Sequence, residues 1–320
     1  MKKITFLLFF ISFSVLSQNR LDRVDNIVKS YKNFTTIESL AKQIDSDFSS
    51  DVEKARAAYT WIATNLNYNS RNPFLIYDTK IYIVSDEEDY QRRLKKEDEK
   101  TALKAFQTKK AVCKGYAYLY RKICDIIGIE NKVVLGYIKS SSYEIGYVPD
   151  RKNHAWNAIK IDGQWKFIDA TQGSGFSYKG VWQPKFNKAY FDIKKETIKN
   201  THFPEDIFWR NYTGQKPLKE FSDLPVFSKA YFNSNFQVVS PSSGQIATQK
   251  RKLIELKLKG IRFNTKIHYK FGDYDKLRKA DVIYEENSVF RILIHSPKES
   301  SPLKIFLDGQ EALSYMVHVE

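Results

Sequence analysis

The sequence has little cysteine and no long hydrophobic run beyond its N-terminal segment. Outside that segment, no apolar stretch approaches the roughly 20 residues that a transmembrane helix needs. The rest of the chain is therefore expected to be soluble or peripheral. No two histidines or cysteines stand at metal-ligand spacing, and the chain has neither a glycine-rich phosphate loop nor a G-x-S-x-G elbow. We therefore expect neither a cofactor nor a metal.

Cys113 and Cys124 are the only cysteines of the chain. The residues between them, KGYAYLYRKI, have a helical pattern, which would separate the two α-carbons by roughly 16 Å at 1.5 Å per residue. A disulfide tolerates at most about 7 Å between α-carbons. The sequence therefore predicts two free thiols.

The N-terminus has the pattern of an export signal. Lys2 and Lys3 are followed by the apolar run 4–16, which is too short to span a bilayer as a mature helix. Residues 1–17 are therefore predicted to be a signal peptide that is removed before Gln18. The mature protein would lie in the periplasm, on the cell surface or outside the cell, and an uncleaved membrane anchor is the alternative.

The chain is strongly basic, with 52 lysines and arginines against 37 aspartates and glutamates and a formal net charge of +15. The surplus is spread along the sequence, as on solvated surfaces, rather than gathered in one tract. It would favour peripheral association with an anionic cell surface through long-range attraction. Nucleic acid is not expected as a partner, because no motif that binds it is present.

The first part of the chain has the apolar spacing of helices at 20–33, 37–48 and 51–65. Asp51 stands where the third of them would have its N-cap. The charged segment SDEEDYQRRLKKEDEK is too polar for a core and predicts a surface helix or excursion. The sequence leaves open whether residues 80–105 cover a cleft.

Residues 111–128 are predicted to form a helix with one buried stripe. The stripe consists of residues at helical spacing, namely Cys113, Ala117, Tyr120, Cys124 and Ile127. Strand patterns follow at 132–138, 155–161 and 165–170. Asp162-Gly163 has the composition of a hairpin turn between the last two strands. From residue 236 onward, short strands broken by turn-rich segments predict a separate β-sandwich-like domain.

Cys113 stands at the start of the predicted helix. The unpaired N–H groups and the dipole at a helix N-terminus stabilise an anion, so this position favours a thiolate nucleophile near neutral pH. The alternative is that Cys113 is only a small buried residue of the apolar stripe. Cys124, in the middle of the same stripe, is predicted to pack in the core.

A thiolate nucleophile needs an imidazole as base and a third group that orients the ring. His154 begins a strand and Asp169 ends the strand that pairs with it, so both lie near the same end of the hairpin. The ring and the carboxylate are therefore expected to meet. His202, in the aromatic-rich segment NTHFPED, is predicted to pack or cap.

Two segments resemble the transglutaminase-like superfamily, a group of papain-related cysteine enzymes. They are AVCKGYAYLYRKICDIIGIENKVVLGYIK and NHAWNAIKIDGQWKFIDATQGSG. They match the forms G-x-C-x-G-(Y/F)-A, HAWN and W-x-x-x-D-x-T, except that Ala111 stands where many members have glycine. AYTWIATNLNYNS resembles the helix that opens the family's domain, so the likeness covers roughly residues 50–235. NTHFPEDIFWRNY and FSDLPVFSKAYF resemble the kyphoscoliosis-peptidase and cytokinesis-protein branch.

The resemblance implies an α+β fold. A papain-like transglutaminase core, with N-terminal helices, a central helix carrying the cysteine and an antiparallel sheet, would be followed by a β-sandwich-like domain. We predict the core at 18–235 and the second domain at 236–320. The resemblance also implies a triad of Cys113 as nucleophile, His154 as general base and acid, and Asp169 as the group that orients the ring.

The implied function is that of an exported cysteine enzyme that acts on amide bonds of a protein or peptide substrate through a thioester. It would be a peptidase or amidase, or a cross-linking acyl transferase. The backbone N–H of Cys113 would hold the oxyanion together with a second donor, for which Tyr68 and Trp61 are candidates. Some members of the branch have lost the cysteine, so a non-catalytic surface scaffold or adhesion protein is the alternative. The substrate, the choice between hydrolysis and transamidation, the oligomeric state and any calcium requirement stay open.

Overall fold

The computed structural model describes residues 19–69, 83–178, 180–234, 236–273 and 275–320. The predicted signal peptide lies outside the described residues, as does residue 235 at the predicted domain boundary. Contacts divide the chain into two compact units, one of residues 1–135 and 154–193 and the other of residues 136–153 and 194–320. The domain limits predicted from the sequence stay a prediction.

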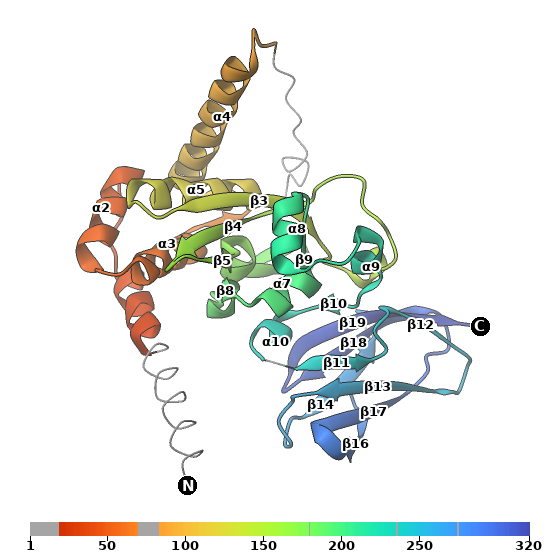
Figure 1. Ribbon diagram of the computed structural model, residues 1–320. Coiled ribbons are helices and arrows are strands. Elements are labelled where there is room, and N and C mark those ends of the chain that lie inside the picture. Colours follow the sequence, from red (N-terminus) through yellow and green to blue (C-terminus); the bar gives the residue numbers. More distant parts are fainter. Residues whose placement is uncertain (1–18, 70–82, 179, 235, 274) are drawn as a thin grey trace, which may run out of the picture. The chain divides into compact units, whose positions relative to one another are not determined.

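The helices of the first unit include those that the apolar spacing predicted at 20–33, 37–48, 51–65 and 111–128, and also two helices, 87–108 and 170–174, that this spacing did not predict (Figure 1). They are a helix that ends at residue 29, α2 (Ile37–Asp47), α3 (Asp51–Asn65), α4 (Glu87–Thr108), α5 (Cys113–Ile126) and the short α6 (Ala170–Ser174). The prediction of Asp51 as an N-cap was wrong by one position, because Ser50 is the cap of α3. Asp51 is instead the first helical residue, where its carboxylate faces the positive end of the helix dipole.

Strands of the first unit form a sheet in the order β8-β5-β4-β3. Their bounds are β3 (Asn131–Ile138), β4 (His154–Ile161), β5 (Gln164–Ile168) and β8 (Phe191–Ile193). The antiparallel strands β4 and β5 are joined at Asp162 and Gly163, whose φ angles of 51° and 74° are those of the predicted hairpin turn. β4 is buried along nearly its whole length. The boundary between the two units falls within β3, after Leu135.

Two small strand pairs also belong to this unit. β1 (Asn67–Tyr68) runs parallel to β2 (Lys110–Ala111), and β6 (Gly175–Tyr178) runs antiparallel to β7 (Val181–Pro184). The first pair brings the end of α3 beside the residues that lead into α5. The second pair follows α6 directly in the chain.

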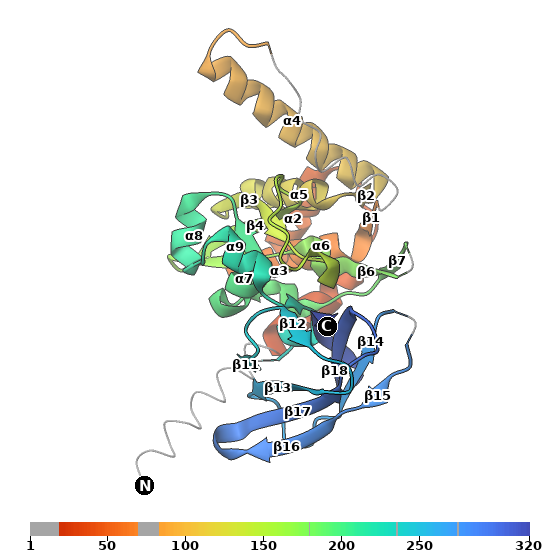
Figure 2. The same ribbon diagram turned by 90° about the vertical axis from the view of Figure 1, so that its right-hand side faces the viewer.

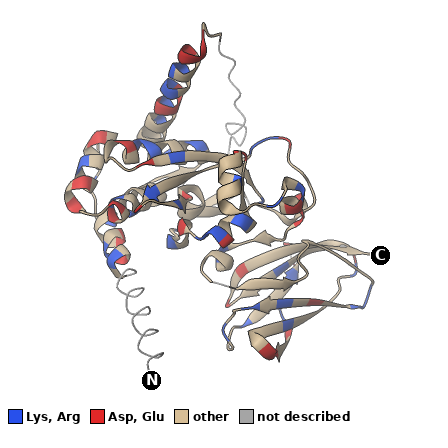
Figure 3. Cartoon of the chain, in the orientation of Figure 1, with Lys and Arg blue, Asp and Glu red and all other residues tan. Residues whose placement is uncertain are grey.

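The charged segment forms helix α4, so the prediction of a surface helix is confirmed. Figure 2 shows that the C-terminal part of α4 lies beside α5, whereas its N-terminal part extends away from α5. Lysines, arginines, aspartates and glutamates are interspersed along the helix (Figure 3). Arg121 on α5 pairs with Asp98 on α4 at 3.3 Å. Both signs of charge are therefore exposed on α4, as expected of a solvated face.

The second unit contains two mainly antiparallel sheets that share one core. The sheet orders are β10-β19-β18-β14-β15, with β12 parallel to β19, and β11-β13-β17-β16. The strands are β10 (Val226–Phe227), β11 (Gln237–Ser240), β12 (Gln245–Thr248), β13 (Leu253–Lys259), β14 (Ile267–Phe271), β15 (Arg278–Lys279), β16 (Asp281–Glu285), β17 (Val289–His295), β18 (Ser301–Leu307) and β19 (Gln310–Val319). Leu256 and Ile292 from one sheet pack in the same buried cluster as Leu303 from the other. The two sheets therefore form a sandwich.

Short elements precede the sandwich in this unit. They are α7 (Lys195–Thr201), β9 (His202–Pro204), α8 (Ile207–Thr213), α9 (Leu218–Asp223) and α10 (Lys229–Phe232). β9 pairs with the last residues of β3, Gly136–Ile138. The predicted fold class is confirmed, because a helical and antiparallel core is followed by a β-rich region. Among the described residues, no helix combines the length and the apolar character needed to cross a membrane.

Candidate active site

Cys113 is the first residue of α5, and Val112 is the N-cap of that helix. The apolar cap offers no side-chain acceptor to the first turn, although the N–H of Gly115 donates a hydrogen bond of 2.8 Å to the carbonyl oxygen of Val112. The positive end of the helix dipole at Cys113 is therefore not neutralised by a capping side chain. Cys113 is fully buried, with 0% of its surface exposed. Gly115 allows this close packing, because a Cβ there would lie 2.5 Å from the Cβ of Ala111. The end of β2 therefore packs directly on the turn that carries the sulfur.

His154 and Asp169 meet at one end of the hairpin, as the sequence predicted. The Nε2 atom of His154, the first residue of β4, lies 2.7 Å from Oδ2 of Asp169. Asp169 does not end a strand, because β5 stops at Ile168 and Asp169 is the N-cap of α6. Its Oδ1 accepts a hydrogen bond of 3.0 Å from the backbone N–H of Gln172. One carboxylate oxygen is thus held by a helix and the other orients the buried imidazole.

The imidazole of His154 also forms a hydrogen bond with the side chain of Cys113. Because Asp169 holds Nε2, the ring nitrogen left for the sulfur is Nδ1. Burial by itself lowers the pKa of His154, but the Asp169 carboxylate and the bond to Cys113 outweigh burial and raise the pKa to about 10. A protonated imidazole favours the thiolate form of a neighbouring sulfur.

The packing of α5 on β4 sets where the sulfur lies relative to the imidazole. Ala155 of β4 lies in one buried cluster with Cys113 and Ala117 of α5. The buried side chain of Asn157 donates a hydrogen bond of 3.0 Å to the backbone oxygen of Ala117. Ala155 and Asn157 both belong to the HAWN segment, in which the sequence alone assigned neither of them a role. The available signal was their spacing of two, which puts them on one face of the strand.

Trp61, one candidate oxyanion donor, packs as a core side chain between α3 and α4. Its ring stacks on Phe106 with 5.4 Å between the ring centroids. The ammonium of Lys109 lies 4.3 Å from the centroid of the Trp61 ring. These contacts account for the burial of Trp61 by packing, and a role as oxyanion donor stays a prediction.

Tyr68, the other candidate, lies on β1 opposite Ala111 of β2. Its ring is 5.5 Å from that of Trp182 on β7. Since Ala111 precedes Cys113 by two residues, Tyr68 lies on the strand beside the segment that leads into the nucleophile. This placement makes Tyr68 the better positioned of the two candidates, and its role also stays a prediction.

Cys124 and His202 have the surroundings of packed side chains. Both cysteines are free and buried, which confirms the prediction of two thiols. Burial raises the pKa of the Cys124 thiol, although a hydrogen bond with Tyr120 opposes this. In the second unit, Nδ1 of His202 lies 2.7 Å from Oγ1 of Thr201, and the ring meets Phe232 edge-on.

Comparison with known proteins supports the resemblance that the sequence predicted. Residues 38–170, which include Cys113, His154 and Asp169, match the model of the transglutaminase-like superfamily. Kyphoscoliosis peptidase of Homo sapiens is 23% identical over 236 residues, which are 73% of this chain and 33% of that protein. Cytokinesis protein 3 of Saccharomyces cerevisiae is 24% identical over 149 residues, which are 44% of this chain and 16% of that protein.

A solved structure described as a TGase is 17% identical and has a TM-score of 0.30. The match covers 58% of this chain and 43% of that one. The chain thus spans about a third of the length of human Kyphoscoliosis peptidase. The predicted likeness to the kyphoscoliosis-peptidase and cytokinesis-protein branch is confirmed.

Proposed function

Since the chain carries a transglutaminase-like domain, we propose that it is a cysteine enzyme that acts on amide bonds through Cys113, His154 and Asp169. One observation supports this most directly. A single buried imidazole bonds both the Asp169 carboxylate, at 2.7 Å, and the side chain of Cys113. Nucleophile, base and orienting group are therefore connected in the order that covalent catalysis requires.

In the first half of the reaction, the Cys113 thiolate attacks the carbonyl carbon of the amide, and a carbon–sulfur bond forms. The carbonyl oxygen becomes an oxyanion. The His154 imidazolium then gives its proton to the amide nitrogen, and the carbon–nitrogen bond breaks. An amine or ammonia leaves, and the acyl group stays on the sulfur as a thioester.

In the second half, neutral His154 accepts a proton from water or from an amine as that molecule attacks the thioester. The carbon–sulfur bond breaks and the thiolate–imidazolium pair is restored. Water gives hydrolysis and an amine gives a new amide, so the two reactions share every residue of the site. Asp169 stabilises the protonated ring in both halves, because its carboxylate accepts the bond from Nε2.

The oxyanion needs two hydrogen-bond donors, each contributing roughly 3 kcal/mol at the transition state. The backbone N–H of Cys113 is one, because it lies in the first turn of α5, where the cap offers no side-chain acceptor. Tyr68 is the second donor that we favour, since it lies on β1 beside the segment that leads into Cys113. The sulfur itself is fully buried, so a substrate reaches it only after a local opening.

The test is a mass-spectrometric survey of the purified chain with a peptide mixture rich in glutamine and a biotin-linked primary amine. We expect cleavage, conversion of glutamine to glutamate, or amine incorporation, and a thioester on Cys113 in acid-quenched samples. Cys113→Ala should abolish each signal, whereas Cys124→Ala, a matched change on the same helix, should keep it. If the parent chain gives no product and no thioester, the protein is better described as a surface scaffold or adhesion protein.

We further propose that the protein is exported and that its basic surface associates with an anionic cell surface. The basic and apolar N-terminal pattern and the net charge of +15 support this. Fractionation of expressing cells followed by N-terminal sequencing should recover a chain that begins near Gln18 outside the cytoplasm. A full-length chain confined to the cytoplasm would contradict the proposal.

A further inference from the structure

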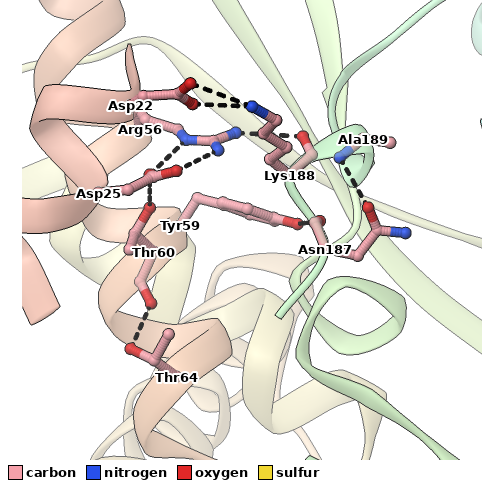
Figure 4. A network of polar contacts seen from close by, with 9 residues as sticks. All are labelled: Asp22, Asp25, Arg56, Tyr59, Thr60, Thr64, Asn187, Lys188 and Ala189. Carbon is pink, nitrogen blue, oxygen red and sulfur yellow. Dashed lines mark hydrogen bonds and ion pairs between the residues drawn. The ribbon is translucent and has the colours of Figure 1, made fainter. Parts of the chain in front are cut away.

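A buried ion pair lies close to the site but outside the triad. Nε and Nη2 of Arg56, on α3, each donate a hydrogen bond of 2.7 Å to the carboxylate of Asp25, on the helix that ends at residue 29. The hydroxyl of Thr60 donates a third, of 2.6 Å, to Asp25. Arg56 and Asp25 are only 2% and 4% exposed. Figure 4 shows this cluster between the N-terminal helices and the segment around residue 188.

Arg56 and its neighbour Tyr59 both hold that segment by its backbone. Nη1 of Arg56 donates a hydrogen bond of 3.1 Å to the carbonyl oxygen of Lys188. The hydroxyl of Tyr59 donates to the carbonyl oxygen of Asn187 (Figure 4). Two consecutive peptide groups, just before and within the 3-10 turn η3 (Lys188–Tyr190), are therefore fixed from α3.

The same segment holds α6, the short helix that Asp169 caps, at both ends. The backbone N–H of Asp169 donates a hydrogen bond of 2.9 Å to the carbonyl oxygen of Tyr190. The backbone N–H of Asn187 donates one of 2.8 Å to the carbonyl oxygen of Gly173. Tyr59 touches α6 as well, because a Cβ on Gly173 would lie 2.0 Å from the Tyr59 hydroxyl oxygen. A displacement of the segment must therefore displace the carboxylate that orients the imidazole.

We infer that Arg56, held by Asp25, is a positioning residue for the His154–Asp169 pair. It acts through the backbone of residues 187–190 and touches neither the imidazole nor the sulfur. This inference rests on the proposed function, because it assigns Arg56 a part in aligning the same site. It also makes the N-terminal helix, which supplies Asp25, a component of the site's support.

A contribution to folding stability does not by itself account for this buried ion pair. Two buried charges lose their hydration, and well-packed apolar residues of similar size are often at least as stable. The surroundings instead favour a fixed orientation, because the guanidinium lies 5.2 Å from the ring centroid of Tyr59 and 5.1 Å from that of Phe191. The guanidinium of Arg56 is planar, and it binds both oxygens of the Asp25 carboxylate and one backbone oxygen. These three bonds together fix its orientation.

The test compares Asp25→Asn with Asp22→Asn, a matched change on the same helix. Asp22 pairs with the side chain of Lys188 at 2.9 Å, but both partners are roughly half exposed, at 43% and 49%, so that pair contributes little. Each variant is measured by the rate of Cys113 alkylation with iodoacetamide as a function of pH. The ring resonances of His154 are titrated by NMR and identified among the 5 histidines from the spectrum of His154→Gln.

We expect Asp25→Asn to slow alkylation about tenfold, the scale of a small misplacement of a reacting group. The titration midpoint of His154 should also fall from about 10 toward 6.5. Asp22→Asn should change the rate by less than about twofold. If Asp25→Asn does not fold, Thr60→Val, which removes one bond to Asp25 and keeps the shape of the side chain, should give a smaller shift in the same direction.

A double variant separates positioning from general stability. In the Asp169→Asn background, Asp25→Asn should add no further change to the alkylation rate or to the His154 midpoint, because its effect passes through Asp169. A change of equal size in both backgrounds, or no change in either, would overturn the inference. Neither readout uses turnover. A failure to find any product would therefore contradict the proposed function but not this inference, and an unchanged alkylation rate and His154 midpoint would contradict this inference but not the proposed function.

Discussion

The apolar stripe on α5 carries the same residue type at two positions, Cys113 and Cys124, in different settings. Cys113 and Cys124 are both free and both 0% exposed. Around Cys124 the main influence is burial, which raises the pKa of its thiol. Cys113 instead lies at the helix start and bonds an imidazole that a carboxylate holds. The comparison teaches that burial alone makes a thiol inert, whereas the attached imidazole and carboxylate make a buried thiol a candidate nucleophile.

The largest effect should come from removing the sulfur at the helix start. Cys113→Ala should reduce acyl transfer and hydrolysis to the level of a blank, because no thioester can form without it. Its melting temperature should stay within a few degrees of the parent, since the change removes a single small atom from a packed site. Product analysis by mass spectrometry and a thermal melt provide the measurement. Residual turnover above the blank would show that another nucleophile operates.

The next effect should come from removing the imidazole that distinguishes the two thiols. His154→Ala should slow iodoacetamide labelling of Cys113 by about 100-fold near neutral pH, in the range of a lost acid–base partner. Labelling of Cys124 should stay as slow as in the parent chain. Peptide mapping by mass spectrometry separates the two sites. Equal labelling of both thiols in the parent would remove the basis of the comparison.

A smaller effect should appear in the pH dependence of stability. The folded-state pKa of His154, about 10, lies above the ordinary value of 6.5, so folding favours the protonated ring. This contribution is fully present below about pH 6.5 and is lost as the pH rises through about 10. Asp169→Asn removes the main cause of the raised pKa. The melting-temperature gap between parent and variant should therefore be wide near pH 6 and narrow above pH 10.

This measurement should be made in a Cys113→Ala background, so that the comparison reports only the pair of His154 and Asp169. A gap that is constant across the range would mean that Asp169 does not raise the pKa of His154. Direct NMR titration of the His154 ring in the same two proteins gives an independent check.

The smallest effect should come from the second thiol. Cys124→Ala removes a buried sulfur from the last turn of α5 and should destabilise the chain by about 1 kcal/mol. Turnover should stay within about twofold of the parent, because Cys124 has no imidazole partner in the part of the chain that the structure describes. Urea unfolding and product analysis measure the two quantities. A large loss of turnover without unfolding would give Cys124 a part in the chemistry.

The parts of the site that depend on neighbouring residues could be predicted from the sequence. The stripe on 111–128 and the Asp162-Gly163 turn are local patterns, and the turn alone brings His154 and Asp169 to one end of a hairpin. The helical and β-rich regions followed from periodicity in the same way.

The parts that depend on distant residues could not be predicted. The bond between Cys113 and the imidazole requires the packing of α5 on β4, which Asn157 fixes through Ala117. The pairing of Arg56 with Asp25 joins two helices that have no shared pattern. The cap role of Asp169 was missed because a carboxylate that ends a strand and one that begins a short helix have the same sequence neighbours.

Because position 115 has no side chain, β2 can pack closely on the first turn of α5. This contact affects how the triad is aligned, not whether its three residues are present. Gly115→Ala would leave Cys113, His154 and Asp169 in the sequence, yet the added methyl would collide with Ala111 at 2.5 Å and drive β2 away from the first turn of α5. A related protein can thus retain all three residues of the proposed triad and still hold its sulfur out of reach of the imidazole. Deciding which members of this group are active therefore requires inspection of this small contact as well as of the three residues themselves.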